Sequence, residues 1–145
     1  MKKIIFILFA LGVLTGASAT LSRSQGGGRI HLSNLYNPGT VQTVQGEVLT
    51  LGKTLSGNGR DYCLNLTLST AKEKILVITE PERYSVTQNH RVSPKEKLVV
   101  TGSRITLLGK PAIIAAEIKK PDAVIRLRDP SGRPAWAVGD DWHTH

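Results

Sequence analysis

The stretch DYCLNLTLS, residues 61–69, alternates apolar and polar side chains without interruption. One face carries Tyr62, Leu64, Leu66 and Leu68, and the other carries Cys63, Asn65, Thr67 and Ser69. Strict alternation is typical of a half-buried β-strand, because successive side chains of a strand point to opposite faces of its sheet. We therefore expect residues 61–69 to line a sheet, with Tyr62 pointing inward beside the leucines.

Further segments of strand character follow the same logic, and turn residues separate them. The first is rich in Val and Thr and has Gly46 in its middle, where a strand would bend or bulge. The strand rhythm stops after residue 79, and residues 80–96 have room for one short helix or an irregular crossover entered after Pro81. The expected strands span residues 41–51, 61–69, 73–79, 97–105 and 111–120, followed by a last short strand at 123–128.

Three strands, a crossover and two more strands are the order of the five-stranded Greek-key barrel called the OB-fold. No segment shows a sustained apolar stripe of helical period, so a helix-rich fold is not supported. An open meander or a β-sandwich would also accommodate these strands. We expect an all-β fold with one short helix or crossover, forming an OB-like barrel domain over residues 41–136.

Residues 1–19 have the pattern of a cleaved secretory signal. Lys2 and Lys3 precede an apolar run at residues 4–14, and residues 17–19 supply the small side chains that signal peptidase requires. The run is roughly half as long as a bilayer span needs, although an uncleaved anchor is the alternative. We expect cleavage after Ala19, a periplasmic or secreted location, and a flexible leader over residues 20–40 that ends in a turn at Asn37-Pro38-Gly39.

The chain is basic and has one cysteine. Loss of Lys2 and Lys3 would lower the formal charge from +8 to +6, a balance that favours anionic partners without naming one. A single cysteine excludes an internal disulfide and any CxxC or CxxCH motif. Cys63 falls on the polar face of its strand, where it is either an exposed thiol able to pair with another chain or a small residue covered by a neighbouring segment.

Four short pieces of the chain carry a resemblance to known proteins: VQGEV (44–48), VVTGSRI (99–105), IIAAEI (113–118) and IRLRDPSGRPAW (125–136). They resemble a group of small exported bacterial OB-fold proteins, which includes the domain shared by the magnetosome proteins MamS and MamX. The resemblance implies a fold, an exported location and an accessory role at a membrane or in an assembly. MamX-like proteins also carry CxxCH haem-attachment motifs, which this chain lacks, so the resemblance implies no cofactor and no redox role here.

The segment IRLRDPSGRPAW gathers three arginines around a turn rich in Pro and Gly. In a structural interpretation, Trp136 closes an open barrel end while Asp129 pairs with a neighbouring arginine. In a functional interpretation, the arginines bind an anionic partner, because a guanidinium suits planar bidentate recognition of an anionic group. A loop at residues 56–60 would then offer a second contact. The candidate partner-binding residues are Arg126, Arg128, Arg133, Trp136 and Arg60.

The terminal sequence DDWHTH offers Asp141, His143 and His145 as weak candidates for a metal site. A chain terminus holds metal ligands poorly, and we interpret these residues as a solvated tail at residues 137–145. The separate residues His31 and His90 are interpreted as ordinary surface or turn residues. No metal and no cofactor are therefore expected.

Catalytic motifs are absent from the sequence: there is no GxSxG, HExxH or phosphate-binding loop. The few aromatic residues and the exported location argue against binding of nucleic acid, which needs stacking platforms along a basic groove. We expect a non-catalytic binding or adaptor module that docks a protein partner or an anionic surface through the basic C-terminal turn, with only peripheral membrane contact. A periplasmic carrier of a metal or small ligand is the alternative, and a small-ligand carrier would have an apolar cavity between barrel and crossover.

Overall fold

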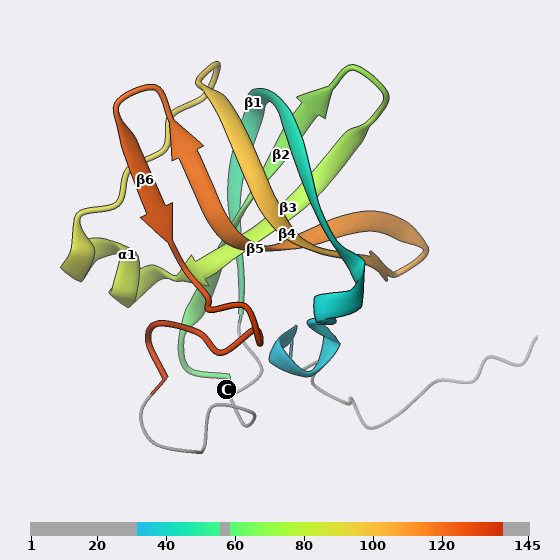
Figure 1. Cartoon of the computed structure of the whole chain (residues 1–145). Helices are drawn as coiled ribbons and strands as arrows, with labels where there is room; N and C mark the ends of the chain where they lie inside the picture. Colours follow the sequence, from blue (N-terminus) through green and yellow to red (C-terminus); the bar gives the residue numbers. More distant parts are fainter. Residues whose placement is uncertain (1–31, 56–58, 138–145) are drawn as a thin grey trace, which may run out of the picture.

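The computed structural model describes residues 32–55 and 59–137, which form a small barrel of strands with one short helix at its side (Figure 1). Two short 3-10 helices, η1 (Leu32–Leu35) and η2 (Pro38–Thr40), precede the barrel. The crossover carries the helix α1 (Glu82–Gln88). The strands are β1 (Val41–Leu55), β2 (Tyr62–Thr70), β3 (Lys74–Pro81), β4 (Lys97–Leu107), β5 (Lys110–Lys120) and β6 (Ala123–Arg126).

Strand pairing confirms the expected OB-fold. β1 pairs antiparallel with both β2 and β4, while β2 pairs with β3 and β4 pairs with β5. A short parallel pairing between β3 and β5, from Leu76↔Ala112 to Ile78↔Ile114, closes the barrel. β6 then pairs with residues 117–120 of β5, beyond the part that β3 occupies. The helix follows directly after Pro81, as the sequence predicts.

The barrel interior is filled by aliphatic side chains from β1 to β6 and from the segment after β6. Leu68, Val77 and Ile113 are fully buried, and the expected inward leucines Leu66 and Leu68 lie in this main core. Gly46 allows β1 to approach β2, because a Cβ at this position would lie 2.2 Å from the carbonyl oxygen of Ser69. The shift in the β1–β2 register comes later, between Val48 and Thr50.

The prediction that Tyr62 points inward is wrong. Tyr62 is 44% exposed, and its ring lies 4.7 Å from the Lys53 Nζ. The reason is that β1 runs four residues beyond its expected end, to Leu55, and pairs there with Tyr62 in a part of the hairpin that β4 does not cover. A register shift between Cys63 and Asn65 in the β2–β3 pairing also interrupts the alternation.

The end of the predicted flexible leader, residues 32–40, is folded onto the barrel. The Ser103 hydroxyl of β4 accepts a hydrogen bond from the Asn37 backbone N–H at 2.9 Å and also bonds the Thr40 hydroxyl at 2.9 Å. Leu32 and Tyr36 pack against a second apolar cluster of Ile78, Ala112 and Ile114. These contacts hold a segment whose composition alone indicates a loop.

The predicted signal peptide, the leader up to residue 31 and the tail at 138–145 lie outside the described residues. Among the residues that are described, no helix has the length and hydropathy to cross a membrane.

Candidate functional site

The C-terminal turn is a tightly bonded continuation of β6. Leu127 is fully buried, and its N–H donates to the Ala116 carbonyl of β5 at 2.7 Å. The chain then reverses, so that Arg128 and Pro134 form an isolated β-bridge and the Ala135 N–H donates to the Leu127 carbonyl at 2.8 Å. The expected last strand thus ends at Arg126, and residues 127–135 form a narrow closed loop against the barrel.

Asp129 fixes the shape of this loop. One of its carboxylate oxygens accepts hydrogen bonds from the Ser131 N–H at 2.9 Å, the Ser131 hydroxyl at 2.6 Å and the Arg133 N–H at 2.9 Å. The bond from Ser131 is the main reason that the pKa of Asp129 lies below its ordinary value. The carboxylate therefore caps the turn, as its Asp-Pro-Ser-Gly sequence indicates.

Arg128 lies inside this arrangement. Its Cζ is 5.6 Å from the ring centroid of Tyr36 and 5.2 Å from that of Trp136, and its Nη1 donates to the Gly132 carbonyl at 2.9 Å. The buried Nε has no hydrogen-bond partner among the described residues. Burial lowers the pKa of the guanidinium to about 10. Cation–π contacts with two aromatic rings thus join the turn to the segment before β1.

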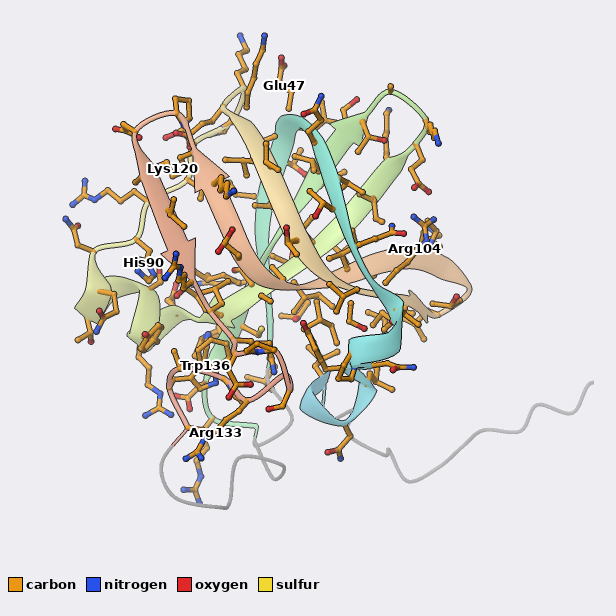
Figure 2. All side chains as sticks on the ribbon, in the orientation of Figure 1. Glu47, His90, Arg104, Lys120, Arg133 and Trp136 are labelled. Carbon is orange, nitrogen blue, oxygen red and sulfur yellow. The ribbon has the colours of Figure 1, made fainter. Side chains whose placement is uncertain are left out.

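Trp136 packs against the main core and against Tyr84 of α1, with ring centroids 5.4 Å apart. It occupies the same end of the barrel as the C-terminal turn (Figure 2). This contact agrees with the structural interpretation of Trp136 as a side chain that closes the barrel end.

The remaining arginines of the sequence-predicted site lie at the surface. The Arg126 side chain is 81% exposed, and its Nε lies 3.5 Å from the Glu117 carboxylate. Arg126 and Arg128 line the same open groove of about 550 Å³, together with Tyr36, Glu117 and Asp129. Arg133 is exposed on the outer side of the turn (Figure 2), and Arg60 is exposed in the loop between β1 and β2. The groove therefore unites two of the five predicted residues.

A second hollow lies between the barrel and the crossover, where the small-ligand alternative expects a cavity. It measures about 370 Å³ and is lined by β1, β2, the end of β3, α1, residues 90–93 and the strands β5 and β6. Its lining is mixed in character. Apolar side chains such as Leu64 and Ile125 face a polar group that includes Thr79, Glu80, Ser85 and His90.

Glu80 and His90 form a buried polar pair at this cavity. The His90 Nδ1 lies 2.9 Å from a Glu80 carboxylate oxygen, and the two side chains are 19% and 6% exposed. Burial raises the pKa of Glu80, and the hydrogen bond with His90 opposes that rise. His90, which the sequence indicates as an ordinary surface or turn residue, lies in the segment after α1, but its side chain is largely buried and does not lie at the surface. His31 lies outside the described residues. The sequence contains an indication that Glu80 is buried, because Glu80 directly continues the apolar run of β3.

Cys63 packs against the second apolar cluster, and burial raises the pKa of its thiol to about 11. It is thus covered by neighbouring strands in the folded barrel. Among the described residues, no three His, Cys, Asp or Glu side chains converge in a way that could hold a metal ion. The weak candidates Asp141, His143 and His145 lie outside those residues, so their role stays a prediction.

Residues 40–125 match the MamS/MamX magnetosome protein family, and this match spans more than half of the chain. No curated protein matches the chain. Among solved structures, the chain is similar to the SSB domain of a protein from Synechococcus sp.. That likeness has a TM-score of 0.44 and 8% sequence identity, and it covers 55% of this chain and 92% of the other.

Proposed function

The chain belongs to the MamS/MamX magnetosome protein family, and on this premise we propose that it is an exported, non-catalytic binding or adaptor module of a magnetosome-type assembly. The docking surface that we propose is the C-terminal turn, with Arg126 and Arg133 as the contacting side chains. The partner is a protein with an acidic surface.

The observation that carries this proposal is the rigid presentation of the two arginines. Asp129 caps the turn with three hydrogen bonds, and the backbone of residues 127–135 bonds to itself and to β5. A surface that is already ordered loses less conformational entropy on binding than a flexible one. Arg126 and Arg133 are therefore exposed side chains on a backbone of fixed shape.

The number of arginines favours a protein partner over a membrane. Recognition of anionic lipid usually relies on clusters of about four to eight basic residues. The exposed arginines are two, Arg126 beside Glu117 and Arg133 on the turn, a number better matched to individual carboxylates, which a guanidinium binds in a bidentate manner. Arg128 takes a different role in this proposal, because its guanidinium is occupied by Tyr36, Trp136 and Gly132.

The first test measures binding of a hexaglutamate peptide to the purified protein at low ionic strength. The double variant Arg126→Gln/Arg133→Gln should fold normally and bind about fivefold more weakly, because exposed charge contacts contribute up to about 1 kcal/mol each. The matched control is Lys72→Gln/Lys74→Gln, which removes the same charge from two exposed positions, one in the β2–β3 turn and one at the start of β3.

Equal loss of binding in both double variants would show that only net charge matters and would overturn the docking role of the turn. A parallel measurement uses vesicles containing phosphatidylglycerol. Vesicle binding that depends on Arg126 and Arg133, without binding of the peptide, would overturn the choice of a protein partner.

A further inference from the structure

The cavity beside the crossover has an apolar floor formed by the barrel core. Leu66, Ile118 and Ile125 are buried members of the main core, and each of them also lines the cavity. Its volume of about 370 Å³ falls within the range of ligand pockets, which runs from roughly 300 to 1,000 Å³. A cavity of about 150 Å³ already holds benzene, so a small organic molecule fits here.

Two hydroxyl groups on the polar side of the cavity, those of Thr79 and Ser85, already donate their protons within the protein. The Thr79 hydroxyl donates to the Leu64 carbonyl at 3.0 Å, and the Ser85 hydroxyl donates to the His90 carbonyl at 3.1 Å. A hydroxyl has one proton and two lone pairs. Both side chains can therefore still accept hydrogen bonds, whereas neither has a proton left to donate to a ligand.

Glu80 extends this set of acceptors, because an ionised carboxylate only accepts hydrogen bonds. The His90 Nδ1 lies 2.9 Å from one of its oxygens. The Glu80 side chain is 6% exposed. Among the described residues, His90 is the ion-pair partner of Glu80. A buried charge without a full counter-charge is costly, and a cation placed beside it would offset that cost.

We propose that this cavity binds a small organic amine, whose ammonium group donates hydrogen bonds to Glu80 and whose apolar body lies on Leu66, Ile118 and Ile125. Arg91 also lines the cavity, but its side chain is exposed and its Nε donates to the Asn89 side chain at 3.1 Å. Its charge is therefore screened by solvent more than that of Glu80. This site is separate from the C-terminal turn and does not depend on the proposed docking function.

The test compares three probes of equal length: hexylamine, hexan-1-ol and hexanoate. Binding to the full protein is followed by amide chemical shifts in nuclear magnetic resonance spectra. Hexylamine should bind at least about tenfold more tightly than hexanoate, because its ammonium group donates hydrogen bonds to Glu80, whereas hexanoate has no proton to donate and carries a charge of the same sign. The largest shifts should fall on residues that line the cavity. A tighter complex with hexanoate, or shifts that fall elsewhere, would overturn the proposal.

Separate variants test the charge of Glu80 and the space inside the cavity. Glu80→Gln should weaken hexylamine binding about tenfold and leave hexan-1-ol binding nearly unchanged. Glu82→Gln, two residues along at a 42% exposed carboxylate, is the charge-matched control and should have no effect. Leu51→Trp, at a half-exposed position of the lining, should block all three probes. If Glu80→Gln fails to fold, the order of affinity of the three probes and the effect of Leu51→Trp test the proposal instead. Binding of the probes to Leu51→Trp at unchanged affinity would refute the proposal.

Discussion

At the residue scale, Gly132 decides whether the C-terminal turn can form. Its φ is 96°, in the region that side chains with a Cβ rarely adopt. A Cβ at this position would also lie 2.4 Å from Cδ1 of the Tyr36 ring. The absent side chain thus allows the turn to reverse and allows Tyr36 to lie against it. This close approach also places the Tyr36 ring beside Arg128.

We predict that Gly132→Ala lowers the free energy of unfolding by about 2–3 kcal/mol, since the left-handed backbone alone costs roughly 1–2 kcal/mol and the collision with Tyr36 adds to it. The control is Gly109→Ala in the β4–β5 turn, where φ is 80° but nothing lies within 4 Å of the added Cβ. Gly109→Ala should cost about 1 kcal/mol. Urea unfolding measures both values, and equal losses would contradict the role of Tyr36.

At the element scale, one ion pair braces the closed side of the barrel. Both Nη atoms of Arg104 on β4 bond the Glu73 carboxylate, at 2.7 Å and 2.8 Å. Glu73 immediately precedes β3, and β4 and β3 are both neighbours of β5. The pair therefore links two strands across the strand that closes the barrel. The hydrogen bond from Arg104 holds the pKa of Glu73 below its ordinary value of 4.5.

A lowered pKa in the folded state means that the unfolded chain takes up the proton first as the solution is acidified. The contribution of Glu73 to stability should be complete above about pH 4.5 and should disappear as the pH falls through the lower pKa of the folded protein. We predict that Glu73→Gln lowers the Tm at pH 7 and that its difference from the unaltered protein vanishes at a pH below the lowered pKa of the folded protein.

Arg104→Lys is the matched variant, because it keeps the charge but cannot form two parallel bonds. It should lower the Tm at pH 7 by a smaller amount than Glu73→Gln. Thermal unfolding followed by circular dichroism at both pH values provides the comparison. A difference between Glu73→Gln and the unaltered protein that is constant with pH would refute the electrostatic explanation.

At the scale of the whole molecule, segments from both sides of the barrel sequence close one of its ends. Tyr36 comes from before β1, Tyr84 from α1, and Arg128 and Trp136 from after β6. In Figure 1 the segment before β1 and the C-terminal turn lie at the same end of the barrel. Chain segments outside the five barrel strands therefore close this end of the barrel.

We predict that Trp136→Ala lowers the free energy of unfolding by about 2–3 kcal/mol, somewhat less than the loss of a fully buried aromatic, because Trp136 is only half-buried. The control is Tyr62→Ala, which removes an exposed aromatic side chain and its contact with Lys53 and should cost under about 1 kcal/mol. Guanidinium unfolding followed by circular dichroism measures both. Similar losses would mean that Trp136 does not contribute to closing the barrel.

The sequence by itself determined the class of fold and the order of its strands. Alternation along residues 61–69, the apolar run of β3 and the break after Pro81 are local properties, since they follow from the two-residue period of a strand and from turn chemistry. The same reasoning applies to the Asp129 turn, whose hydrogen bonds join residues at most four positions apart. Local preferences of this kind can be read without knowing which segments meet.

Only the tertiary structure decided which side chains meet across long separations. Tyr62 is exposed because β4 leaves that part of the hairpin uncovered, and residues 32–40 are ordered because Ser103 lies opposite them. Arg128 is enclosed by Tyr36 and Trp136, and Glu80 meets His90 at a cavity, because barrel closure and the crossover bring these residues together. The burial of each side chain depends on its neighbours in space, and the local sequence pattern does not contain them.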